Sequence, residues 1–133
     1  MRTSEPGSRE VVLVVPNLFF ATRIAASAKR MGIQVRHASP SSAAEACRAS
    51  TPALAILDLE APGDLPALIR ELKSTPATRG VRIVAFYPHV HNALRVDALA
   101  AGADLVLPRS AFTAKLEALL AGDDRAGDDG TAV

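Results

Sequence analysis

Five short runs of strand-forming residues, separated by stretches with helical spacing, constrain the fold of this chain more than any other feature. They predict strands at residues 11–15, 33–37, 53–57, 81–86 and 105–107. Val11–Val15 is apolar throughout, as in a strand buried on both faces, whereas Ile33–His37 alternates apolar and polar residues like an edge strand. Strands that alternate with helices predict an α/β fold, in which one doubly wound parallel sheet of five strands carries helices on both faces.

The helical stretches carry start and stop signals. Gly32 and Gly102 stand where helices are expected to end. Ser42 and Glu45 have the spacing of a capping box, and Ser110 can cap the last helix. Helices are predicted over Phe20–Met31, Ala43–Ala49, Leu65–Lys73, Asn92–Ala101 and Ala111–Leu120.

Length and composition predict a single folded domain. The chain has 133 residues, enough for one domain with a self-sufficient core. We expect this domain to cover residues 10–121, after a flexible N-terminus at residues 1–9. Residues 122–133 are rich in Gly and Asp and almost lack large apolar side chains, which predicts a disordered tail.

Composition argues against several classes of function. The formal net charge is +1 without a basic block, and aromatic residues are only 4%, so no nucleic-acid interface is expected. Cys47 is the one cysteine, which excludes an intrachain disulfide and a cysteine zinc site and predicts ordinary helix packing. No apolar stretch is long enough to span a membrane and the N-terminus lacks a signal peptide, so a soluble cytoplasmic protein is expected.

One carboxylate stands out at the predicted edge of the sheet. Asp58 directly follows the apolar run Ala53–Leu57 and precedes a turn. The carboxyl ends of parallel strands meet at one edge, and open α/β sheets bind their ligands there. The strand ends expected at that edge are residues 15–17, 58, 86–88 and 107–109.

Asp58 after the third predicted strand, Pro62 four residues later and Gly102-Ala103-Asp104 before the fifth form a pattern. With this pattern, residues 10–120 resemble the receiver domain of bacterial two-component response regulators. Asp58 stands where that family has its phosphoacceptor aspartate, and Pro62 matches a proline of the following loop. Gly102-Ala103-Asp104 resembles the family's Gly-Ala pair before the fifth strand. The resemblance implies a flavodoxin-like sheet with the strand order 2-1-3-4-5.

The same resemblance implies that most of the family's functional residues are replaced. Pro16 and Asn17 align with the acidic pair that binds the divalent cation, and Tyr87 aligns with the Thr or Ser that contacts the phosphoryl group. Arg109 aligns with the lysine after the fifth strand, and Val106 with the aromatic switch residue. The chain therefore looks like an atypical receiver, or pseudo-receiver, and we do not expect it to be an enzyme.

Magnesium affinity is expected to be poor at such a site. Mg²⁺ is usually held by one or two carboxylates together with waters and phosphate oxygens. Pro16 has no side-chain oxygen, so the candidate ligands are Asp58, Asn17 and Glu60, all of them weak. Glu60 is expected to be a solvated loop residue. The sequence therefore predicts no bound metal or other cofactor.

The sequence does not determine where two side chains at this edge lie. Arg109 either pairs with Asp58 in a permanent ion pair or is exposed and unpaired. Tyr87 either fills the space of a phosphoryl group or lies outward on the surface.

Two further motifs have plain interpretations. Of Phe19 and Phe20, one is expected in the core, while the other is left open as an exposed contact for a partner. His89 and His91 have a spacing that zinc sites use, but exposed loop histidines are the favoured interpretation.

The resemblance implies a stand-alone signalling protein, monomeric or homodimeric, that contacts protein partners such as a histidine kinase or a downstream effector. The implied contact face lies on the fourth helix, fifth strand and fifth helix and includes Asn92, Arg95, Lys115 and Glu117. Two alternatives remain: a regulator phosphorylated on Asp58 despite its degenerate site, and an α/β module that binds a small molecule near Asn17, Phe19 and Tyr87.

Overall fold

The computed structural model describes residues 9–88 and 91–123. Its strands are β1 (Glu10–Val14), β2 (Gln34–His37), β3 (Leu54–Asp58), β4 (Arg82–Tyr87) and β5 (Leu105–Pro108). Its helices are α1 (Leu18–Arg30), α2 (Ala43–Ser50), α3 (Leu65–Ser74), α4 (Asn92–Ala101), α5 (Arg109–Ala114) and α6 (Leu116–Ala121). Within the described ranges, no helix has the length and apolar character needed to cross a membrane.

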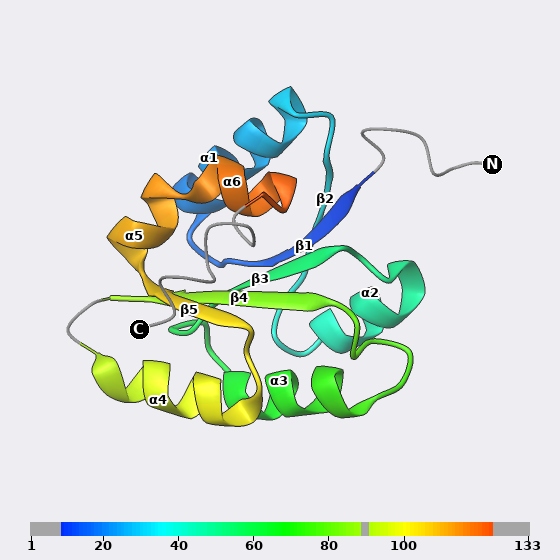
Figure 1. Ribbon diagram of the computed structural model, residues 1–133, viewed down its shortest axis with the longest axis vertical. Coiled ribbons are helices and arrows are strands. Elements are labelled where there is room, and N and C mark those ends of the chain that lie inside the picture. The colour runs from blue at the N-terminus through cyan, green and yellow to red at the C-terminus, as the bar shows by residue number, and fades with distance from the viewer. Residues whose placement is uncertain (1–8, 89–90, 124–133) are drawn as a thin grey trace.

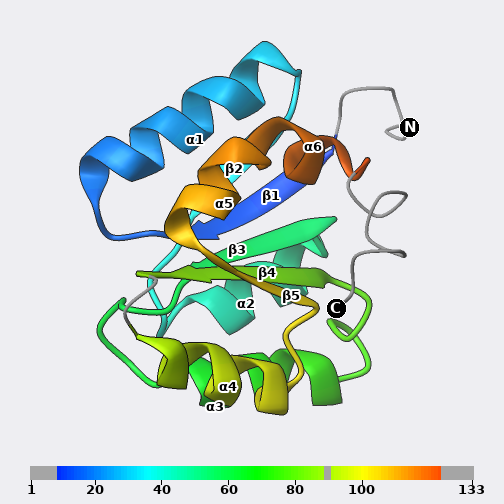
Figure 2. The ribbon, with the colours of Figure 1, turned by 60° about the vertical axis from the view of Figure 1, so that its left-hand side comes forward.

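The strands form one parallel sheet in the order β2-β1-β3-β4-β5, as predicted. Helices α1, α5 and α6 cover one face of the sheet, and α2, α3 and α4 cover the other (Figures 1 and 2). The predicted flexible N-terminus lies outside the described residues apart from Arg9, and so does the predicted tail apart from Gly122 and Asp123.

Two apolar clusters fill the spaces between the sheet and its two helical layers. Along β1, Val12 and Val14 point into the α2–α3–α4 layer, while Val11 and Leu13 point into the α1–α5–α6 layer. All four side chains are fully buried, which explains why this strand is apolar without alternation. Cys47 is also fully buried, and this burial raises the pKa of its thiol to about 11. The prediction that Cys47 is a packing residue is confirmed.

Strand pairing brings the predicted strand ends together. Val14 pairs with Leu57 across β1 and β3, and Asp58 pairs with Phe86 across β3 and β4. Tyr87 in turn pairs with Pro108 across β4 and β5. The residues that follow β1, β3, β4 and β5 therefore share one edge, where the candidate site lies.

The boundaries predicted for the last helix are wrong. The helix is divided into α5 and α6 at Lys115, and it begins at Arg109, so Ser110 lies inside the first turn and is not the cap. The Thr113 hydroxyl donates a hydrogen bond to the Arg109 carbonyl at 2.9 Å, a bond that tends to bend helices. The break lets α6 turn its apolar residues, Leu116, Leu119 and Leu120, towards the core.

The cap of one predicted helix and the start of another also differ from the structure. The capping box at Ser42 does not form, because the Ser42 hydroxyl accepts a hydrogen bond from the Ser39 amide at 3.0 Å. Glu45 instead pairs with Arg48 at 2.8 Å. Helix α1 begins two residues earlier than expected, at Leu18, because the preceding Asn17 caps it.

A part-buried polar contact ties α3 to the amino ends of β4 and β5. The Asp104 carboxylate accepts a hydrogen bond from the Ile83 amide at 2.8 Å and pairs with Lys73 Nζ at 2.7 Å. Lys73 Nζ also donates to the Val81 carbonyl at 3.1 Å. We expect Asp104→Ala to lower the free energy of unfolding by about 1–3 kcal/mol, because it leaves the Ile83 amide unpaired.

Urea unfolding measures this effect, with Asp97→Ala on the exposed side of α4 as the matched control. The control should change the free energy of unfolding by less than about 0.5 kcal/mol. Equal effects of the two substitutions would contradict a specific role for Asp104.

Candidate functional site

Asp58 lies at the carboxyl end of β3 and is half-buried. One of its oxygens, Oδ1, accepts a hydrogen bond from the Glu60 amide at 2.9 Å. Burial raises the pKa of this carboxyl above its ordinary value of 3.8, and it outweighs the Glu60 amide and the positive charge of Arg109, which lower the pKa. The anionic form of Asp58 is therefore held in surroundings that solvate it poorly.

The side chain of Asn17 already has a structural role. Its Oδ1 accepts a hydrogen bond from the Phe20 amide at 2.9 Å, which caps the first turn of α1. Pro16, before it, offers no side-chain donor or acceptor. The two residues that align with the family's acidic pair therefore carry no negative charge, and the amide oxygen of Asn17 already has a partner.

Arg109 is exposed, as in one of the two arrangements left open by the sequence, but its side chain has a contact that the sequence did not indicate. No ion pair within 4.0 Å joins it to Asp58 in the described ranges, although its charge still lowers the pKa of Asp58. Its guanidinium carbon instead lies 4.2 Å from the ring centroid of Phe20 and 5.9 Å from that of Phe86. A cation over an aromatic face gains about 0.5–1 kcal/mol at an exposed site.

The ring that receives Arg109 belongs to an aromatic cluster that sequence reasoning missed. The centroids of Phe20 and Phe86 are 5.2 Å apart, and those of Phe86 and Phe112 are 4.8 Å apart. These residues come from α1, β4 and α5, three elements far apart in the sequence. The available signal was that three of the chain's four phenylalanines occupy predicted inward positions.

Tyr87 and Val106 lie inward on the opposite face of the sheet. Both side chains are buried in the apolar cluster beneath α4, with Leu94 packed against that cluster. The interpretation of Tyr87 as an outward surface residue is therefore wrong. The aromatic side chain in this cluster is that of Tyr87, from β4, whereas β5 contributes Val106.

The loop after β3 is linked to the start of α4. Nδ1 of His91 lies 3.2 Å from Oε2 of Glu60, and both side chains are about half-exposed. The other histidine of the predicted pair, His89, lies outside the described residues. Glu60 therefore has a side-chain partner and is more than a solvated loop residue.

The residues at the edge fit a resident divalent cation poorly. Within residues 9–88 and 91–123, no group of three or more His, Cys, Asp or Glu side chains is placed to hold a metal ion. Asn17 caps a helix, Glu60 contacts His91, and Asp58 is left as a lone carboxylate. Mg²⁺, which releases its waters reluctantly, gains little from a single carboxylate.

Two apolar patches are exposed, one at the start of α1 and the other on α4. Phe20 is buried, as expected of one member of the Phe pair, whereas Phe19 is 90% exposed and Leu18 is 79% exposed. On α4, Val96 is 52% exposed and Leu99 is 40% exposed. Both patches leave large apolar side chains in water.

The residues of the contact face implied by the resemblance do not all lie on one surface. Asn92, Arg95 and Lys115 are exposed, as a contact face requires. Glu117 is exposed too, but its carboxylate pairs with Arg30 of α1 at 3.5 Å. Because α1 covers the other face of the sheet from α4, Glu117 belongs to a different surface (Figure 2).

The raised pKa of Asp58 predicts how stability depends on pH. A carboxyl whose pKa is higher in the folded state adds stability below its ordinary value of 3.8, and this stability is lost as the pH rises through the folded value. At pH 7 we therefore expect Asp58→Asn to be more stable than the parent protein, with the difference disappearing at acidic pH.

Thermal unfolding between acidic and neutral pH measures this dependence. Asp97→Asn, on the exposed side of α4, is the matched control and should follow the parent protein at every pH. A destabilised Asp58→Asn at pH 7 would show that the negative charge supports the fold.

Scans against protein-family models and against curated proteins found no match to this chain. Solved structures do match. The receiver domain of a sensor histidine kinase from Pseudomonas aeruginosa, solved with magnesium coordinated in its active site cleft, is 21% identical. Its match covers 86% of this chain and 98% of that chain, with a TM-score of 0.72.

Two more receiver domains are similar to the same extent. The signal receiver domain of a histidine kinase from Syntrophus aciditrophicus is 23% identical over 89% of this chain and 94% of that chain, with a TM-score of 0.72. That of a DNA-binding response regulator from Colwellia psychrerythraea is 20% identical over 84% and 95%, with a TM-score of 0.73. The chain therefore has the flavodoxin-like fold of response-regulator receiver domains.

Proposed function

We propose that this protein is a receiver-type signalling module that acts through protein contacts and does not use magnesium-dependent phosphorylation of Asp58. The observation that carries the proposal is the commitment of Asn17 to the cap of α1, beside a proline that has no ligand atom. Phosphoryl transfer to a carboxylate depends mainly on positioning and charge neutralisation. An edge where Glu60, the carboxylate next to Asp58, already contacts His91 supplies little of either.

The Pseudomonas receiver domain has magnesium in its cleft, and this chain differs at the positions that the resemblance assigns to cation binding. Asp58 would have to hold the ion almost alone, because Glu60 already contacts His91. Its raised pKa indicates an environment that disfavours negative charge, and a phosphorylated aspartate would add more of it.

Arg109 and Tyr87 favour a single conformational state. The guanidinium of Arg109 lies over the Phe20 ring, away from an ion pair with Asp58. Tyr87 is only 5% exposed and packs beneath α4, so an inward aromatic side chain is already in place without phosphorylation. We infer that the protein presents a constant surface, and that it has no catalytic activity of its own.

The surface that best suits a partner is the start of α1. Leu18 and Phe19 project two large apolar side chains beside the sheet edge, with Arg23 one turn further along the helix. Exposed apolar side chains surrounded by polar residues are typical of protein–protein contact sites. We propose that a partner, a histidine kinase or an effector protein, covers this patch.

Incubation with magnesium and acetyl phosphate, followed by intact-mass analysis, tests the absence of phosphorylation. We expect the parent protein to keep its mass. The double variant Pro16→Asp/Asn17→Asp restores two carboxylates, and Asp caps helices as well as Asn does. It should bind Mg²⁺ more tightly and gain one phosphoryl group.

A gain of one phosphoryl group by the parent protein that disappears in Asp58→Asn would overturn the proposal. That result would favour the alternative of a regulator phosphorylated on Asp58.

A surface kept for contacts should be dispensable for folding. We expect Phe19→Ala to change the free energy of unfolding by less than about 0.5 kcal/mol. The neighbouring substitution Phe20→Ala removes a buried ring of the aromatic cluster and should cost about 3–5 kcal/mol. Urea unfolding of the two variants measures the difference, and comparable losses would mean that Phe19 serves the fold.

A further inference from the structure

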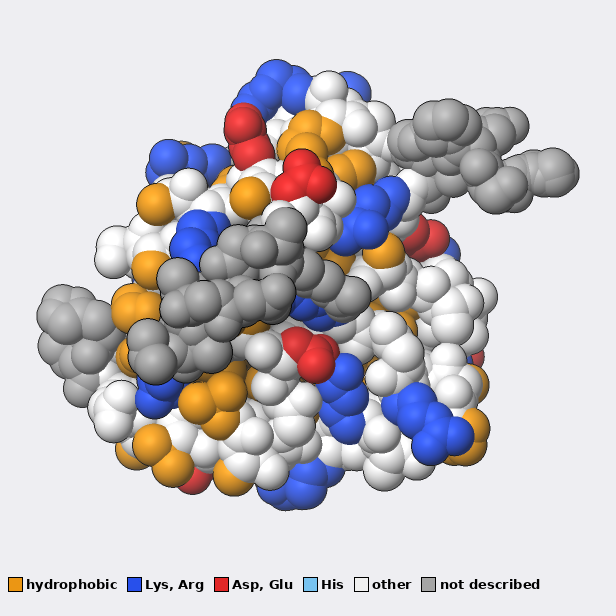
Figure 3. All heavy atoms as spheres, viewed as in Figure 1, with side chains coloured by type: hydrophobic (Ala, Val, Ile, Leu, Met, Phe, Trp, Pro, Cys, Tyr) orange, Lys and Arg blue, Asp and Glu red, His pale blue; other side chains and the backbone are white. Residues whose placement is uncertain are grey.

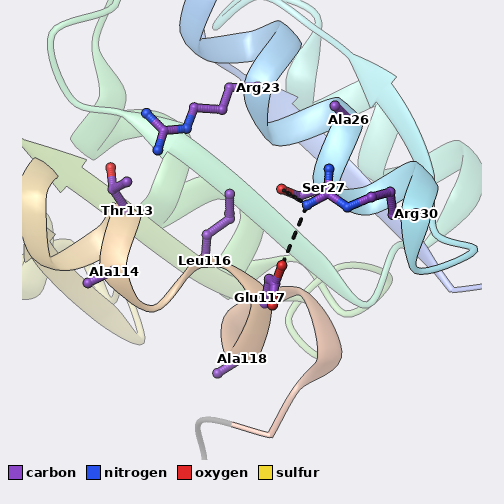
Figure 4. A pocket seen from close by; sticks show the side chains of 9 residues that line it. All are labelled: Arg23, Ala26, Ser27, Arg30, Thr113, Ala114, Leu116, Glu117 and Ala118. Carbon is purple, nitrogen blue, oxygen red and sulfur yellow. Dashed lines mark hydrogen bonds and ion pairs between the residues drawn. The ribbon is translucent and has the colours of Figure 1, made fainter.

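A groove of about 390 Å³ lies between α1 and the divided last helix, on the face of the sheet opposite α4 (Figure 4). Its volume falls within the range of small-molecule sites, roughly 300–1,000 Å³. The polar residues that line it are Arg23, Ser27 and Arg30 from α1, Thr113 from α5 and Glu117 from α6.

The groove exists because the last helix is broken and its neighbours are small. At Lys115 the chain turns from α5, which packs on β4 and β5, into α6, which packs on α1. The side chains between the polar residues are Ala26, Ala114 and Ala118, and they leave space that larger residues would fill. Leu116, almost fully buried, forms an apolar floor.

The α1 wall of the groove is a basic stripe. Arg23, Ser27 and Arg30 follow one another at spacings of four and three residues, which places them on one side of the helix. Helix α1 holds three basic residues and no acidic residue, although the whole chain has a net charge of only +1. Lys and Arg side chains lie at the top of Figure 3, in the region of α1, with acidic side chains among them.

The two arginines of the stripe differ in their contacts. Arg30 is held at one end of the groove, since its Nη2 lies 3.5 Å from the Glu117 carboxylate and donates to the Ser27 hydroxyl at 3.2 Å. Arg23 has no hydrogen bond or ion pair to any residue in the described ranges, and its guanidinium points towards Thr113 (Figure 4). The groove thus has one neutralised end and one end with an available cation.

We propose that this groove binds a small organic anion, whose phosphate or carboxylate oxygens are held by Arg23. The guanidinium fork matches a pair of anionic oxygens, and such charge-assisted hydrogen bonds are the stronger kind. The body of the ligand lies over Leu116 and the alanines, and its far end reaches Arg30 and Glu117. The exposed Arg30–Glu117 pair contributes little to stability and can rearrange around a ligand.

The proposal does not depend on Asp58, because Asp58 does not line the groove. Phosphate and carboxylate share the chemistry that Arg23 recognises, so the experiment separates them with matched probes. Phenyl phosphate and benzoate have the same apolar body with different anionic groups, and phenol is the neutral control.

Titration followed by amide NMR shifts tests the proposal on the full chain. We expect saturable shifts at Ala26, Ser27 and Thr113 with phenyl phosphate or benzoate and none with phenol. The tighter of the two probes identifies the anionic group. Arg23→Gln should weaken binding about tenfold or more. Glu117→Gln should strengthen it, because it removes a negative charge and releases Arg30.

The matched control is Arg95→Gln, which removes an exposed arginine from α4 and should leave the affinity unchanged. Equal weakening by Arg23→Gln and Arg95→Gln would mean general attraction to a basic surface and would overturn the proposal. Shifts at the groove with an acidic peptide but with neither small anion would also overturn it.

Discussion

Burial of the central strands on both faces is the constraint on which the rest of this structure depends. Val11–Val14 of β1 and Leu54–Leu57 of β3 are almost completely excluded from water, so each face of the sheet needs its own helical layer. Parallel pairing then brings the strand ends to one edge, and Asp58 is carried there by the register alone. The position of the candidate site follows from packing.

At that edge, side chains that could otherwise bind a ligand already make contacts within the fold. Asn17 caps α1, Arg109 lies over Phe20, and Glu60 contacts His91. The cap is worth about 0.5–2 kcal/mol, and each of the other two contacts about 1 kcal/mol or less. Together they leave Asp58 without a cation ligand beside it.

The fold could be predicted from the sequence because its signals are local and repeated. Apolar runs, helical spacing and helix-ending glycines determine the elements, and their alternation implies parallel pairing. The break at Lys115 could not be predicted, because it reflects a hydrogen bond from Thr113 and the packing of α6 on α1. The contact between Arg109 and Phe20 could not be predicted either, because it forms only when α1, β4 and α5 pack together.

The fold makes no use of the charge of Asp58. Its Oδ1 accepts the Glu60 amide, and an asparagine oxygen in the same place could accept that bond equally well. The attraction to Arg109 does not compensate for burial, since the net effect is a raised pKa. A carboxylate that costs stability at neutral pH gains from anything that brings a positive charge or a hydrogen-bond donor to the edge. Asp58 is therefore better suited to meet a positively charged group at the edge than to hold the domain together.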